Sequence, residues 1–126
     1  MRARHILHHS VNVHGGLDAA AAFYGGVLGL SIEPSRPVIP GIEGTWFRIG
    51  GSEIHLVDAD LDTDAIRPTD VHVCLAVDDI DEAIRELDQA NVPYRLASQG
   101  PVTQVFLADP SGNIIELQQD RSEAST

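Results

Sequence analysis

Four side chains that can bind a metal ion stand at matching points of two similar stretches of the sequence. His8 opens the stretch HHSVNV and His72 opens HVCLAV, and each lies five residues before a valine. His55 in EIHLV and Glu116 in IIELQ then lie at the same point near the end of each half. Self-similarity of this kind indicates a duplicated unit. Three imidazoles and one carboxylate at paired positions therefore predict one metal site built from two copies of that unit.

The types of these side chains limit which ion they can hold. Imidazole suits zinc, iron, nickel and cobalt, and a carboxylate extends the choice to manganese. Calcium and magnesium prefer sites made of oxygen ligands alone and are disfavoured. We therefore expect a divalent ion (Zn, Ni, Co, Mn or Fe(II)), whose identity the ligand set leaves open. On an octahedral ion, four protein ligands would leave two neighbouring positions for two adjacent oxygens of a substrate.

The elements that must position these ligands follow one order in each half. In the first half, alternation predicts a strand over residues 6–13 with His8 and Ser10 on one face. Apolar residues at three-and-four spacing then predict an amphipathic helix that ends at Gly29, with Phe23 and Tyr24 in its core. A short strand (31–33), a loop rich in proline and glycine (34–44) and two further strands (45–49 and 53–57) complete this half.

The second half repeats this order. It predicts a strand over 71–77, a helix over 79–90, and strands over 94–97, 103–107 and 113–118, with a turn at 109–112. The two units cover about residues 5–58 and 70–119, and the acidic stretch 59–69 is the linker between them. We predict one α+β domain over residues 1–126, in which two βαβββ units form a cupped mixed sheet with helices on the outer face.

The facing of the strands decides which side chains surround the ligands. The residues that flank the ligands, such as Leu75 and Leu117, are apolar, and we expect them to pack against the helices. Because side chains alternate along a strand, the ligands must point to the opposite, concave face. We expect a substrate pocket on that face, lined by Ser10, Trp46, Arg48, Gln104 and Phe106. Cys74 is interpreted as a small buried strand residue.

The order of elements and several phrases resemble those of one family. The phrases FYGGVLGL, SEIHLV, HVCLAVDDIDEAI and DPSGNIIEL are similar to those of the glyoxalase, bleomycin-resistance and dioxygenase family, also called the vicinal oxygen chelate superfamily. The resemblance implies that each unit curls into half of a cup around a divalent metal, held by His8, His55, His72 and Glu116. Members similar to glyoxalase I carry glutamate at the position of His55, and those similar to methylmalonyl-CoA epimerase carry glutamine. The histidine here thus removes one of the two carboxylates that the glyoxalase reaction uses.

Three functions remain open at this point. The first is a metal-dependent lyase or isomerase acting on a small substrate that chelates the metal through vicinal oxygens, with Glu116 or His55 moving the proton. The second is a ring-cleaving dioxygenase, in which two histidines and Glu116 hold ferrous iron and His55 is a nearby base. The third is a binding or resistance protein, although competent residues at all four metal positions favour an enzyme. The resemblance also implies a homodimer, and leaves open whether the site closes within one chain or between two.

Composition excludes several classes of partner. The 126 residues suit one domain, and 19 acidic residues against 8 basic ones, with no lysine, disfavour nucleic acids and anionic membranes. We find no apolar run long enough to span a bilayer and no signal-peptide pattern at the start of the sequence. The single cysteine allows no internal disulfide, which fits a reducing compartment. We therefore expect a cytoplasmic protein that binds a small molecule.

Overall fold

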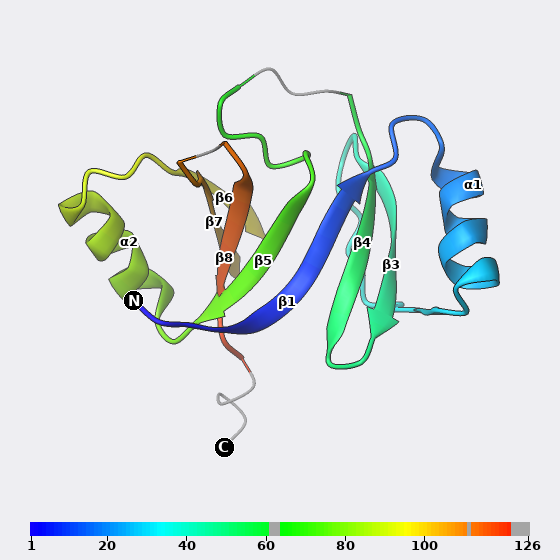
Figure 1. Ribbon diagram of the computed structural model, residues 1–126, viewed down its shortest axis with the longest axis horizontal. Helices are drawn as coiled ribbons and strands as arrows, with labels where there is room; N and C mark the ends of the chain where they lie inside the picture. Colours follow the sequence, from blue (N-terminus) through cyan, green and yellow to red (C-terminus); the bar gives the residue numbers. More distant parts are fainter. Residues whose placement is uncertain (61–63, 111, 122–126) are drawn as a thin grey trace.

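A computed structural model describes residues 1–60, 64–110 and 112–121. In this part of the chain, eight strands form one mixed sheet in the order β2-β3-β4-β1-β5-β8-β7-β6 (Figure 1). The sheet is curved, and the predicted α+β fold of two βαβββ units is confirmed. None of the helices in these residues has the length and apolar character needed to cross a membrane.

The elements of each half follow the predicted order. The first half contains β1 (Ala3–Asn12), α1 (Leu17–Ala21), η1 (Ala22–Val27), β2 (Ser31–Ile32), β3 (Glu43–Ile49) and β4 (Ser52–Asp58). The second half contains β5 (His72–Val77), α2 (Ile80–Gln89), β6 (Arg95–Gln99), β7 (Val102–Ala108) and β8 (Ile114–Gln119). Residues 61–63 of the predicted linker, Ser111 of the predicted turn and the acidic tail at 122–126 lie outside the described residues.

The pairing of the strands brings the two halves together along their first strands. β1 runs antiparallel to β5, with His8 opposite Cys74 and Ser10 opposite His72. Each first strand also pairs in parallel with the last strand of its own half, so that Ser10 faces His55 and Cys74 faces Glu116. The register therefore makes His55 and Glu116 equivalent, as the repeat in the sequence predicts. Both lie on strands next to the junction of the halves.

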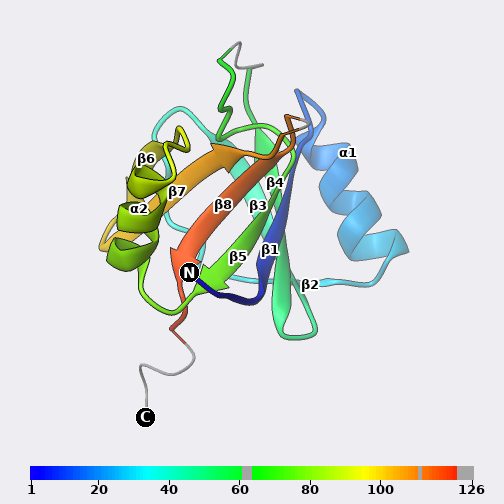
Figure 2. The same cartoon turned by 60° about the vertical axis from the view of Figure 1, so that its left-hand side comes forward.

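The second helix packs closely on the outer face of the sheet (Figure 2). It begins at its N-cap Asp79, whose carboxylate accepts hydrogen bonds from the backbone N–H groups of Asp81 and Glu82. Its apolar face is buried in one cluster with apolar side chains of the sheet. This cluster contains Val77, Ile80, Ala83, Leu87, Val105 and Leu117. The strands of the second half are thus held from behind, with alternate residues directed to the opposite face.

The first helix departs from the sequence prediction. The helical spacing predicts a regular helix that ends at Gly29, but α1 ends at Ala21 and the chain continues as the π-helix η1 to Val27. The wider π turn shifts the positions that face the sheet. Phe23 is 49% exposed, so its predicted place in the core was wrong. Tyr24 is partly buried, with its ring 6.2 Å from that of Phe47.

Candidate metal centre

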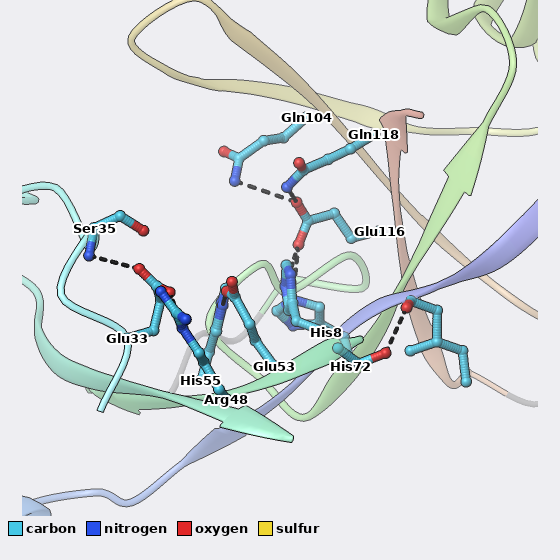
Figure 3. A network of polar contacts seen from close by, with 12 residues as sticks. His8, Glu33, Ser35, Arg48, Glu53, His55, His72, Gln104, Glu116 and Gln118 are labelled. Carbon is cyan, nitrogen blue, oxygen red and sulfur yellow. Dashed lines mark hydrogen bonds and ion pairs between the residues drawn. The ribbon is translucent and has the colours of Figure 1, made fainter. Parts of the chain in front are cut away.

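Three of the four predicted ligands meet at a single oxygen atom of Glu116. His72 Nε2 lies 2.9 Å and His8 Nε2 3.1 Å from Glu116 Oε1 (Figure 3). All three side chains are buried, and Glu116 is 1% exposed. His8 comes from β1, His72 from β5 and Glu116 from β8, so strand pairing within one chain brings them together.

The second ring nitrogen of His72 shows that this cluster suits a cation. His72 Nδ1 lies 2.8 Å from the carbonyl oxygen of Asp70, to which it can only donate a hydrogen bond. In the neutral ring, Nε2 then carries a bare lone pair that faces the carboxylate. Two electron-rich atoms at this distance require a proton or a metal ion between them. The donor set of two imidazoles and one carboxylate therefore fits a divalent ion.

The other oxygen of Glu116 is held by two amides. Glu116 Oε2 accepts hydrogen bonds from Gln118 Nε2 at 2.6 Å and from Gln104 Nε2 at 3.3 Å. Burial raises the pKa of Glu116, but its contacts with His72, His8 and Gln118 outweigh this effect and hold the pKa below its usual range. Glu116 is thus kept as an oriented anion at the floor of the site.

His55 lies beside the cluster, between two rings. The Trp46 ring stacks on it at 3.9 Å and 1°, and the His8 ring at 3.8 Å and 18°. Ring nitrogens bind metals through lone pairs that lie in the ring plane, and stacked rings direct these lone pairs along nearly parallel lines. His8 and His55 can therefore share one ion only if a ring turns. Ligation by His55 stays a prediction.

His55 has a carboxylate partner of its own. His55 Nε2 lies 2.7 Å from Glu53 Oε1. Burial and the neighbouring charge of His8 lower the pKa of His55 to about 2, so the ring is neutral near pH 7. Burial also raises the pKa of Glu53. The two groups form a hydrogen-bonded pair, one strand away from the cluster.

A cavity of about 240 Å³ opens onto these groups. Four of the five predicted substrate-binding residues line it, namely Ser10, Trp46, Gln104 and Phe106. Arg48 does not, because its guanidinium pairs with Glu33 and its side chain is 62% exposed. Arg36, from the loop between β2 and β3, lines the cavity instead. The walls combine aromatic rings with few charged groups, as is typical of a small-molecule site.

Comparison with known proteins agrees with this geometry. Residues 6–117 match the family model described as the Glyoxalase/Bleomycin resistance protein/Dioxygenase superfamily. The chain belongs to this superfamily. No match was found among curated proteins. The match covers both units and all four predicted metal positions.

Solved structures of the superfamily fold resemble the chain over most of its length. Methylmalonyl-CoA epimerase from Mycobacterium tuberculosis is 18% identical, with a TM-score of 0.73 over 98% of this chain and 92% of that one. A variant of Streptomyces coelicolor methylmalonyl-CoA epimerase in complex with 2-nitronate-propionyl-CoA is 20% identical, with a TM-score of 0.71 over 96% and 100%. A superfamily member from Vibrio splendidus 12B01 is 18% identical, with a TM-score of 0.65 over 94% and 100%. At these identities the likeness establishes the fold.

Three residues of this superfamily member were not assigned to the site from its sequence. Glu53 lies two residues before His55 on the same strand face, and this alternation could have identified it. Arg36 lies in a loop that no periodic pattern places. Cys74 is buried as predicted, and burial raises the pKa of its thiol. However, its sulfur also lies within 4.8 Å of ligand atoms of both His8 and Glu116.

Proposed function

We propose that this protein is a metal-dependent isomerase or lyase that moves a proton at a carbon next to a carbonyl group of a small substrate. The observation that carries the proposal is the meeting of His8 Nε2 and His72 Nε2 at one oxygen of Glu116. The solved structures that carry the name methylmalonyl-CoA epimerase, an isomerase, support this class of reaction.

His8, His72 and Glu116 would hold the ion, which we propose to be Zn, Ni, Co, Mn or Fe(II). When bound, such an ion acts as a Lewis acid that stabilises negative charge on a substrate oxygen. The predicted fourth ligand, His55, would join them only after its ring turns away from Trp46 and His8. Gln104 and Gln118 would keep the carboxylate of Glu116 oriented.

We assign the proton transfer to His55 rather than to Glu116. Both oxygens of Glu116 are engaged by His8, His72, Gln104 and Gln118, which leaves neither free to take a proton from the substrate. His55 is neutral, lines the cavity, and has Glu53 to orient its ring and share its proton. Trp46 and Phe106 would exclude water from the reacting carbon.

Proton exchange in heavy water tests this proposal. The protein is freed of metal with a chelator, reloaded with one ion at a time, and incubated with a panel of small 2-oxo, 3-oxo and 2-hydroxy acids. We expect NMR to detect deuterium at the carbon beside the carbonyl for at least one substrate, only after reloading. Loss of exchange in His8→Ala and His72→Ala would tie the reaction to this site. Exchange that persists at full rate without metal would contradict the proposal.

One observation favours a second candidate function. Two histidines and one glutamate meet directly, while His55 stands beside them as a base, and this is the arrangement of a ring-cleaving dioxygenase with ferrous iron. Oxygen uptake with catechols after anaerobic Fe(II) loading tests it. Less than roughly a tenth of an equivalent of metal in the purified protein would favour the third possibility, a binding or resistance protein.

We also propose that the protein forms a homodimer in the cytoplasm. Four large apolar side chains between residues 23 and 32 are exposed, and such groups are common at contacts between chains. They are Phe23, Val27, Leu28 and Ile32. The free thiol of Cys74 fits a reducing compartment.

A further inference from the structure

Arg36 lies at the boundary between two cavities. The inner one is the cavity of about 240 Å³ that opens onto the metal-binding cluster, and the outer one is a more open cleft of about 860 Å³. Arg36, Ile39 and Ile42 line both. Among the described residues that line them, Arg36 is the only arginine or lysine. A substrate that reaches the cluster from the cleft must therefore pass this guanidinium.

The loop that carries Arg36 is fixed by its own hydrogen bonds. Ile42 N donates to the carbonyl oxygen of Ile39 at 3.1 Å, across a turn that contains Pro40 and has Gly41 at a φ of +76°. Proline followed by a glycine with positive φ is the signature of a type II turn. The carbonyl oxygen of Ile42 in turn accepts a hydrogen bond of 2.9 Å from Arg36 Nη2. The guanidinium is thus held at the boundary before any ligand arrives.

The guanidinium still has hydrogen-bonding capacity to spare. Arg36 Nε is buried and has no hydrogen-bond partner among the described residues, and Nη1 makes only a long contact of 3.4 Å with the carbonyl oxygen of Pro37. No carboxylate of the described chain lies within ion-pair distance of Arg36. Nε and Nη2 lie against Gly44, since a Cβ there would come within 3.1 and 3.2 Å of them, so Nη1 is the nitrogen left for a ligand. An anionic ligand at Nη1 would replace this long contact by a charge-assisted hydrogen bond.

The charges of the two cavities limit what this ligand can be. The outer cleft is lined by three acidic side chains, Glu43, Asp58 and Asp60, which disfavour a ligand that carries several phosphates there. The inner cavity has room for a small molecule only. One guanidinium with Nη1 available suits a single carboxylate.

We propose that Arg36 binds a carboxylate of the substrate, and that the substrate is a small free carboxylic acid rather than a nucleotide-bearing thioester. This inference rests on the proposed function, because the other oxygens of the acid would reach the ion held by His8, His72 and Glu116. Arg36 would set the orientation of the acid in the inner cavity. Arg48, which the sequence suggested for substrate binding, is already paired with Glu33.

Two probes that differ by one carboxylate test the inference on the Zn-loaded protein. Acetohydroxamate presents two vicinal oxygens without a carboxylate, and the monohydroxamate of succinic acid presents the same oxygens together with one. By calorimetry, we expect the acid to bind about tenfold to a hundredfold tighter than acetohydroxamate. In Arg36→Gln this advantage should disappear, while the affinity for acetohydroxamate and the metal content stay as in the wild type. Arg85→Gln, on the exposed face of α2, is the matched control and should keep the advantage.

The possible outcomes separate the two proposals. If neither probe binds the wild type and no metal is retained, the proposed function fails. If both probes bind the wild type equally, or the advantage survives in Arg36→Gln, only the present inference fails. Arg36→Lys covers the case in which Arg36→Gln does not fold, and it should keep the charge but reduce the advantage to a few-fold. Malonyl-coenzyme A should displace acetohydroxamate no better than malonate does, and tighter binding of the thioester would overturn the substrate class.

Discussion

Replacing Glu116 by glutamine tests whether Glu116 is a metal ligand or only the partner of histidines in an ordinary buried ion pair. In the wild type, Oε1 faces His8 and His72, and Oε2 accepts bonds from Gln104 and Gln118. A glutamine has the same shape and can turn its NH2 group toward the two histidines. His72 can accept this bond, because its Nδ1–H is already given to the carbonyl oxygen of Asp70. Every polar group can therefore keep a partner in Glu116→Gln.

The expected magnitudes follow from this exchange of partners. In the metal-free protein, the variant replaces charge-assisted bonds by neutral ones, which lowers the free energy of unfolding by about 1–2 kcal/mol. An amide nitrogen cannot bind the ion as a carboxylate does, so we expect metal affinity to fall more than about a hundredfold. Metal at about one hundred times its dissociation constant stabilises the wild type by about 2.7 kcal/mol. The same concentration should leave the variant almost unchanged.

The assay combines urea unfolding of the metal-free proteins with calorimetric titration of Zn and Co. Glu53→Gln is the control, because Glu53 contacts His55 and not the cluster, and it should bind metal like the wild type. If Glu116→Gln retains wild-type metal affinity, the cluster is not a metal site. If it loses more than about 4 kcal/mol of stability without metal, Glu116 acts mainly as the partner of buried charges, and the argument from matched hydrogen bonds is wrong.

Three further predictions use other parts of the chain. His55→Asn should bind metal with an affinity within about tenfold of the wild type, as measured by titration, but should lose the proton exchange that NMR detects. If the variant loses the metal, His55 is a ligand. Because burial lowers the pKa of His55 to about 2, the unfolded chain takes up a proton there below about pH 6.5 while the folded protein does not. Stability of the metal-free protein should therefore fall by up to about 1.4 kcal/mol per pH unit as the pH drops from about 6.5, and His55→Asn should flatten this slope in urea unfolding. Phe23→Glu together with Val27→Glu should convert a dimer to a monomer in light scattering, and a monomeric wild type would refute the dimer.

The repeat in the sequence predicted the fold because strand alternation and module order constrain one another. His8 lies within β1 and His72 opens β5, and the antiparallel pairing of these two strands places both on one face at the junction of the halves. The same argument placed Glu116 beside them, and Ser10, Trp46, Gln104 and Phe106 around the cavity. Each of these side chains lies on a strand, where a period of two fixes its direction.

The residues that the sequence did not reveal are those whose positions depend on turns or on pairing partners. Arg36 reaches the cavity because a turn at Pro40 and Gly41 folds its loop back, and no periodicity reports such a path. Arg48 has the correct strand face, but its charge is taken up by Glu33, a contact between residues that are distant in sequence. The exposure of Phe23 follows from a π turn, which no helical spacing of apolar residues foretells.

The two halves support the site in different ways, although they share one order of elements. In the second half, Ile80, Ala83 and Leu87 bury α2 against the sheet and fix β5 and β8 from behind. The first helix, rich in alanine and glycine, has no buried residue but contacts β3 and β4, while β1 depends on strand pairing and on the stack of His8 with His55. Removal of the Trp46 ring should therefore loosen His55 more than a comparable loss at Phe106 loosens His72, because His72 is also held by Asp70 and Glu116. His55, the proposed proton carrier, is held by ring stacking and by Glu53 rather than by a backbone carbonyl, so we expect its ring to turn more readily than that of His72 when an ion or a substrate binds.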